Sequence, residues 1–142
     1  LQFFILCGKN KTLYQQLIKF NRSHLIPIPF IRSRKMMDCI YNFADLIITK
    51  PGGVTITECL HKQIPIFIYD HLPGQEEINF EELQIQKLVH NATGWKKQNH
   101  LDDLIMSFVE SPNLISGYYE NIYRYERNKD PVNSSQLIIE QL

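Results

Sequence analysis

Two glycines stand between an apolar run and a helix-forming stretch, within residues 50–55, KPGGVT. Glycines let a backbone approach a ligand closely, and the free N–H groups of a helix's first turn attract an anion. The segment therefore favours a diphosphate site. By itself the signal is weak, because strand–Gly-Gly–helix turns are common and often only form a tight turn. The segment is neither a Walker A nor a GxGxxG pattern, which disfavours ATPase and NAD-binding functions.

Thr55 and Glu58 open the same predicted helix and allow two interpretations. They match the S/T-x-x-E capping box, in which the two residues satisfy each other's backbone donors. Taken alone, we favour this cap over a ligand role by about two to one. A carboxylate one turn into the helix could instead accept hydrogen bonds from the two hydroxyls of a ribose, as acidic residues do in nucleotide sites.

A second segment with polar side chains, residues 73–79 (PGQEEIN), opens another predicted helix. Pro and Gly suit the turn, and the acidic residues favour the N-terminal dipole. Gln75 and Asn79 lie four residues apart, on one helix face. An amide and a carboxylate side chain together suit sugar hydroxyls, because each hydroxyl can donate to the carboxylate and accept from the amide.

Strands and helices alternate around these segments up to about residue 90. Apolar runs predict strands at residues 2–7, 25–31, 45–49 and 64–69, and helical spacing predicts helices at 11–20, 36–44, 55–62 and 76–87. This alternation predicts an α/β fold, a Rossmann-like parallel sheet with helices on both faces, whose ligands lie at the carboxyl ends of the strands. Further helices are expected at 101–109, 114–127 and 134–142.

Charge and composition exclude several classes of function. Residues 1–71 hold nine Lys/Arg and four Asp/Glu, whereas residues 72–142 hold six Lys/Arg and eleven Asp/Glu. The chain as a whole therefore has no net positive charge, and we expect no nucleic-acid partner. Apolar runs are far shorter than the ~20 residues of a membrane-spanning helix. Three cysteines without a CxxC and five histidines without HxxxH or HExxH spacing disfavour a metal site and predict reduced thiols.

Residues 44–58 (ADLIITKPGGVTITE) and 73–79 together resemble the glycosyltransferase family 28 C-terminal domain. The resemblance is to diacylglycerol glucosyltransferases and monogalactosyldiacylglycerol synthases above all, and residues 7–10 (CGKN), followed by Leu13, fit this glycolipid branch. It covers most of the chain. It implies the GT-B fold, in which a C-terminal domain holds the UDP-sugar and an N-terminal domain holds the lipid acceptor and the general base.

The resemblance also implies which residues bind the nucleotide. Gly52, Gly53, Val54 and Thr55 would lie along the diphosphate. Glu58 would bind the ribose hydroxyls, which shifts the balance away from a cap-only role.

On the sugar side, Gln75 and Glu76 would hold the hydroxyls, with Asn79 nearby. Gly8 lies on another loop at the carboxyl end of a predicted strand and is included in the expected UDP-sugar site. Arg34 falls where the family contacts uracil through its backbone.

Two departures from the family pattern carry further expectations. Gln63 occupies a position where the family usually has glycine, so we expect a positive φ and mild strain there. The family's domain begins with a further strand and a phosphate loop that residues 1–142 lack. We therefore expect a fragment that forms one UDP-sugar-binding domain, with residues 101–142 as its helical tail.

The expected parent protein is an inverting hexosyltransferase in which a lipid hydroxyl, such as that of diacylglycerol, attacks the anomeric carbon of UDP-glucose or UDP-galactose. The resemblance implies no cofactor or obligatory metal, and a cytoplasmic protein peripheral to the inner face of the membrane. We place no catalytic residue in this chain, regard His71 as a hydrogen-bonded or solvated loop residue, and expect the isolated chain to be inactive.

Two alternatives stay open. A non-catalytic subunit could bind UDP-sugar and pair with a separate membrane-bound acceptor subunit. A nucleotide-sugar epimerase on the same fold would need catalytic acids and histidines that we do not find at suitable positions in this sequence.

Overall fold

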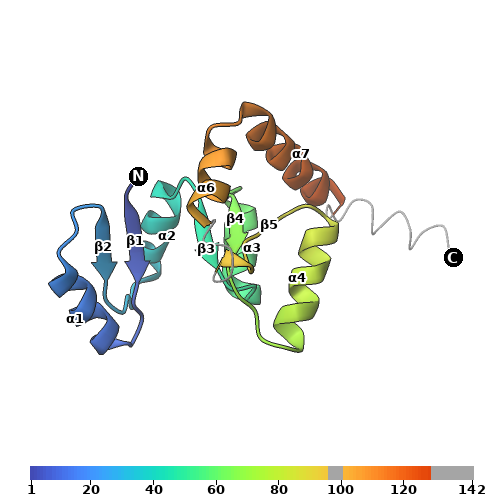
Figure 1. The fold of residues 1–142 in the computed structure, drawn as a ribbon. Coiled ribbons are helices and arrows are strands. Elements are labelled where there is room, and N and C mark those ends of the chain that lie inside the picture. The colour runs from blue at the N-terminus through green and yellow to red at the C-terminus, as the bar shows by residue number, and fades with distance from the viewer. Residues whose placement is uncertain (96–100, 129–142) are drawn as a thin grey trace, which may run out of the picture. The chain divides into compact units, whose positions relative to one another are not determined.

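The computed structural model describes residues 1–95 and 101–128 and shows an α/β fold in which all strand pairs of that part are parallel. The chain divides into two compact units, residues 1–43 and 44–142, whose elements are labelled in Figure 1. The elements in chain order are β1 (Phe3–Leu6), α1 (Lys11–Phe20), β2 (Leu25–Ile28), α2 (Arg34–Phe43), β3 (Ile47–Thr49), α3 (Gly53–His61), β4 (Ile66–Ile68), α4 (Gln75–Ile85), β5 (His90–Asn91), α6 (Leu101–Val109) and α7 (Pro112–Asn128).

The first unit is a β1–α1–β2–α2 segment. Strands β1 and β2 pair in parallel from Phe3 opposite Leu25 to Leu6 opposite Ile28. The chain leaves β1 through Gly8, whose φ of 54° is a conformation that favours glycine. Asn10 then caps α1, because its Oδ1 accepts the Leu13 N–H at 3.0 Å.

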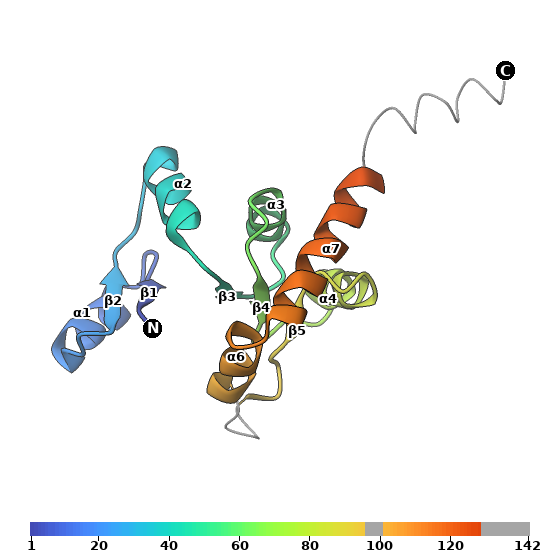
Figure 2. The same cartoon turned by 90° about the horizontal axis from the view of Figure 1, so that it is seen from above.

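The second unit is built on a sheet with strand order β3-β4-β5. The central strand β4 is fully buried, with Ile66, Phe67 and Ile68 each 0% exposed. Figure 2 looks along these strands and shows α3 and α6 on opposite sides of the sheet. Because β3 and β4 are parallel neighbours, the chain segments that follow them leave the sheet at the same edge.

Helices α6 and α7 pack against this sheet through a cluster of aromatic rings. Phe67 of β4 and His90 of β5 stack at 4.6 Å between ring centroids, and Phe108 of α6 meets both rings edge-on. Tyr118 of α7 stacks on His90 at 5.5 Å. Its hydroxyl donates a 3.0 Å hydrogen bond to the carbonyl of Ile64, just before β4. Burial in this cluster lowers the pKa of His90 and raises the pKa of Tyr118.

The predicted α/β fold and the alternation of strands and helices are confirmed, although the strands form one sheet in each unit. The strand β5 was not expected, because two residues carry no usable periodicity. The positive φ expected at Gln63 is confirmed at 58°. The helix predicted at residues 134–142 lies outside the described residues, and the division into domains stays a prediction. Within the described part, no helix has the length and apolar character that crossing a bilayer requires.

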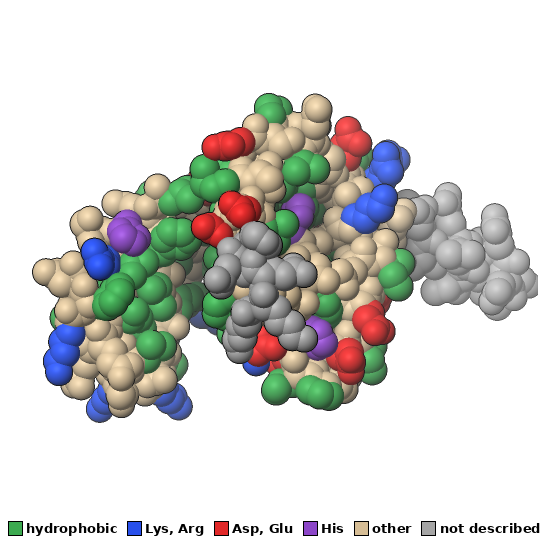
Figure 3. All heavy atoms as spheres, in the orientation of Figure 1, with side chains coloured by type: hydrophobic (Ala, Val, Ile, Leu, Met, Phe, Trp, Pro, Cys, Tyr) green, Lys and Arg blue, Asp and Glu red, His purple; other side chains and the backbone are tan. Residues whose placement is uncertain are grey.

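The charge difference along the sequence follows the units more closely than the two halves. Residues 1–43 hold seven Lys/Arg and one Asp, whereas residues 44–142 hold eight Lys/Arg and fourteen Asp/Glu. Figure 3 shows this contrast on one face of the molecule, where the visible part of the first unit carries Lys and Arg side chains and no acidic ones. The first unit is therefore strongly basic.

Candidate functional site

The N-terminus of α3 differs from the sequence prediction. The helix begins at Gly53 with Gly52 as its N-cap, and no side chain caps it. The capping box predicted for Thr55 and Glu58 is therefore wrong: Thr55 already lies in the first turn, and the first helical bond runs from the Ile56 N–H to the Gly52 carbonyl at 3.0 Å. The reason is that Gly52 adopts an extended conformation, φ −72° and ψ 130°, that starts the helix earlier.

This early start leaves a set of backbone donors at the beginning of α3. The Gly52 N–H is bonded to the Lys50 carbonyl at 2.8 Å. The N–H groups of Gly53, Val54 and Thr55 have no acceptor among the described residues, as expected for the first turn of a helix. Val54 is 76% exposed, so this turn faces open space. Three N–H groups aimed along a helix axis can hold an anion.

Neither packing nor backbone conformation requires glycine at positions 52 and 53. A Cβ atom built on either residue would meet no atom within 4 Å, and neither φ is positive. Gly74, by contrast, has a φ of 97° that favours glycine. Two glycines that the fold itself does not need are consistent with a backbone that another molecule approaches closely.

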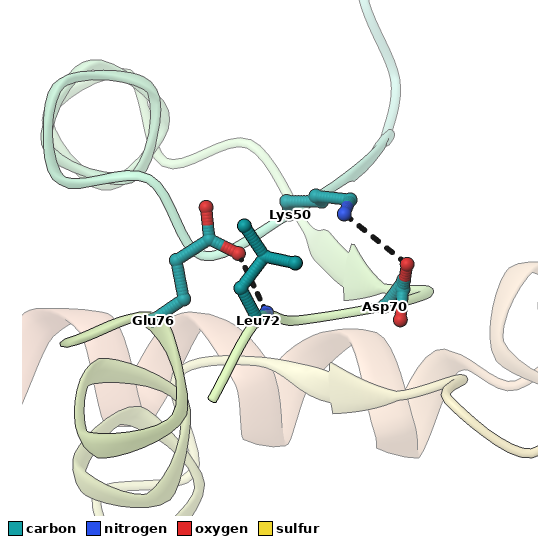
Figure 4. Close-up of polar contacts among 4 residues, drawn as sticks. All are labelled: Lys50, Asp70, Leu72 and Glu76. Atoms are coloured by element: carbon teal, nitrogen blue, oxygen red, sulfur yellow. Dashed lines mark hydrogen bonds and ion pairs between the residues drawn. The ribbon is translucent and has the colours of Figure 1, made fainter. Parts of the chain in front are cut away.

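The second loop, between β4 and α4, is held by the first acidic residues of its own helix. The Glu76 carboxylate accepts the Leu72 N–H at 2.9 Å, as Figure 4 shows, and the Glu77 carboxylate accepts the Gly74 N–H at 3.4 Å. These contacts fold the loop back onto the start of α4. The predicted pair of Gln75 and Asn79 is also confirmed as neighbours, because the Gln75 Nε2 donates to the Asn79 Oδ1 at 2.9 Å.

Asn79 joins this helix to the glycine turn. Its Nδ2 donates to the carbonyl of Pro51 at 3.3 Å, across 28 positions of the sequence. Pro51 is buried to more than 98%. The structure thus brings the two motifs together, with the amide of Asn79 between Gln75 and the residue just before Gly52.

An ion pair spans the same edge of the sheet. Lys50 follows β3 and Asp70 follows β4, and the Lys50 Nζ lies 3.1 Å from the Asp70 carboxylate (Figure 4). Both side chains are partly exposed, at 34% and 46%. The bond to Asp70 raises the pKa of Lys50, so the ammonium stays charged. The sequence alone does not pair these two residues, since their pairing depends on the β3–β4 register.

His71 packs against α4, a contact that the sequence analysis did not predict. Its ring stacks on Phe80 of α4 with 5.1 Å between centroids. Its Nδ1 is buried and has no hydrogen-bond partner within the described residues. His71 therefore packs the β4–α4 loop against α4. The only indication of this contact in the sequence is an aromatic residue, Phe80, nine positions after His71.

The remaining predicted site residues are placed as follows. Glu58 is exposed on α3, one turn beyond Thr55. Gly8 and Arg34 belong to the first unit, where Gly8 lies in the loop after β1 and Arg34 begins α2. Their part in a common site stays a prediction. Within residues 1–95 and 101–128, no cluster of His, Cys, Asp and Glu could hold a metal ion. The buried thiol of Cys59 has its pKa raised to about 12 by desolvation.

Comparison with known proteins connects this arrangement to one family. The model of the glycosyltransferase family 28 C-terminal domain matches residues 1–79. An uncharacterized glycosyltransferase of Bacillus subtilis (strain 168), YkoN, is 40% identical over 121 residues, which are 85% of this chain and 32% of that protein.

Processive diacylglycerol beta-glucosyltransferases are also similar. Those of Bacillus pumilus (strain SAFR-032) and Bacillus cytotoxicus are 35% and 34% identical over 78 and 79 residues, which are 55% and 56% of this chain. The chain spans about a third of the length of YkoN and a fifth of the length of these two enzymes. Because the family model matches more than half of the 142 residues, the chain belongs to the glycosyltransferase family 28 C-terminal domain family.

Proposed function

We propose that this chain is the donor-binding part of an inverting glycosyltransferase that transfers a hexose from a UDP-sugar to a lipid acceptor such as diacylglycerol. The observation that carries the proposal is the open glycine turn at the start of α3, with three N–H groups that have no acceptor among the described residues. Family membership and the names of the similar enzymes support the class of reaction.

The diphosphate of UDP would lie against Gly53, Val54 and Thr55. Their N–H groups and the positive end of the α3 dipole would stabilise the negative charge that grows on the diphosphate as the sugar–oxygen bond breaks. Because this stabilisation comes from the backbone, we propose that the step needs no obligatory metal. Glu58, one turn farther along α3, would accept hydrogen bonds from the ribose hydroxyls.

The hexose would lie against the start of α4, where Gln75 and Glu76 offer an amide and a carboxylate. We propose no general base in this chain. The acceptor and the base would come from another part of the protein that approaches the same sheet edge, and contact with the membrane would also be made there. The isolated 142-residue chain is accordingly proposed to bind UDP-sugar without transferring the sugar.

A calorimetric titration of UDP tests the donor site. Gly53→Val should abolish UDP binding, because the added side chain occupies the space through which the diphosphate would reach the N–H groups. The fold itself should tolerate the change, since a Cβ at this position meets no atom of the chain within 4 Å. Gly117→Val is the matched control, since a Cβ at Gly117 in α7 also meets no atom. Glu58→Gln should weaken UDP binding by about three- to tenfold, because Gln keeps one acceptor oxygen but lacks the charge that strengthens hydrogen bonds from the ribose hydroxyls. Absence of UDP binding by the unaltered chain, or equal binding by Gly53→Val, would contradict the proposal.

A further inference from the structure

The hydrogen bond from Asn79 to Pro51 attaches the glycine turn to α4. We propose that Asn79 is a positioning residue for the diphosphate: its amide fixes the peptide plane between Pro51 and Gly52 and so keeps the start of α3 in the conformation that binds an anion. Asn79 would act through the backbone of the turn and not by touching the diphosphate. This inference rests on the proposed function above, and the test below separates the two.

The glycine turn has one such attachment. Gly52 and Gly53 carry no side chain that could hold the turn, and a Cβ at either position would meet no atom within 4 Å. In the part of the chain that the structure describes, the bond from Asn79 is the only hydrogen bond between residues 51–53 and another helix or strand. Helix α4, which carries Asn79, is itself packed into its unit through the buried Phe80 and Leu83.

This bond acts on a single peptide plane. The Pro51 carbonyl and the Gly52 N–H belong to one planar peptide unit. The Asn79 Nδ2 donates to that carbonyl at 3.3 Å, and the Gly52 N–H donates to the Lys50 carbonyl at 2.8 Å. Both polar ends of the plane are therefore bonded, directly before the chain enters α3.

Gly52 is the reason that this plane needs to be held. Its φ of −72° suits any residue, but glycine adopts positive φ values about as readily. Without the bond to Asn79, the plane before Gly52 can rotate, which turns the Pro51 carbonyl away from α4 and reverses a peptide dipole beside the proposed diphosphate position. A turn that spends only part of its time in the binding conformation binds more weakly, in proportion to that fraction.

The test measures the binding of UDP and of uridine, which lacks the phosphates, by NMR titration of the 142-residue chain. Asn79→Leu has nearly the shape of asparagine but no hydrogen-bonding group, so it fills the same space without the bond to Pro51. We expect Asn79→Leu and Asn79→Ala each to weaken UDP about three- to tenfold, as for a turn that keeps its binding conformation in about a third to a tenth of the molecules. The affinity for uridine should stay within about twofold, because the phosphates alone contact the turn.

A residue that only fills space would give a different result, since Asn79→Leu would then bind UDP as tightly as the unaltered chain. The matched control is Gln86→Ala, because the Gln86 Nε2 makes a similar contact at the other end of α4, to the Glu82 carboxylate at 3.3 Å. This variant should change neither affinity. Asn79 is only half-buried, so we expect both variants at this position to fold, and circular dichroism checks this.

The outcomes distinguish the two proposals. If UDP does not bind the unaltered chain, the proposed function and this inference are both overturned. If UDP binds the unaltered chain and Asn79→Leu equally well, only the inference is overturned. The inference is likewise overturned if uridine is weakened as much as UDP, because the loss would then not concern the diphosphate.

Discussion

Removing the hydroxyl of Tyr118 tests how the C-terminal helices support the sheet. Tyr118 is 3% exposed, and its hydroxyl donates to the Ile64 carbonyl at 3.0 Å. The substitution Tyr118→Phe keeps the ring contacts with His90 and Phe108. It removes the hydrogen-bond donor to the carbonyl of Ile64, a residue that is only 4% exposed. A buried acceptor left unsatisfied costs about 1–3 kcal/mol, so we expect the free energy of unfolding to fall by that amount.

The assay is urea unfolding followed by circular dichroism. A loss of ~1 kcal/mol in a domain of about 100 residues corresponds to a fall of roughly 4–8 °C in the thermal midpoint, so thermal unfolding would also detect the effect. Tyr123→Phe on the same helix is the matched control, because Tyr123 is 59% exposed and its change should stay within about 0.5 kcal/mol. The reasoning is refuted if Tyr118→Phe unfolds at the same urea concentration as Tyr123→Phe.

Two further changes test the backbone and the aromatic cluster. Gln63→Gly should raise the free energy of unfolding by about 0.5–1 kcal/mol, because the positive φ of 58° is strained for Gln. Gln63→Ala should give no such gain, and urea unfolding of both variants measures the difference. Burial lowers the pKa of His90 below 6.5, so the unfolded chain binds this proton more readily than the folded one. Stability should therefore be complete above about pH 6.5 and fall as the pH is lowered through 6.5, by at most ~1.4 kcal/mol per pH unit, and His90→Phe should reduce this dependence in urea titrations at pH 7.5, 6.5 and 5.5.

The sequence predicts the elements well where the apolar pattern is long or a special residue marks a boundary. The residue range predicted for α1 is confirmed without change, as is that for α6, and the family pattern correctly indicated the positive φ at Gln63. The start of α3 was predicted two residues late. Thr55 and Glu58 have the spacing of a capping box, but an extended Gly52 can also serve as an N-cap, and local side-chain preferences do not reveal which start the chain adopts.

In the candidate site, too, features that depend on sequence neighbours were predictable, whereas features that depend on distant residues were not. Gln75 and Asn79 were predictable as neighbours because their spacing alone places them on one helix face. The direction in which each amide is turned was not predictable, since it depends on the carbonyl of Pro51, which the fold brings to Asn79 from 28 positions away. An amide has nearly the same shape in both orientations but opposite hydrogen-bonding character. That the two side chains are neighbours can therefore be inferred from the sequence, whereas the orientation of each amide follows only from the packing of α4 against the glycine turn.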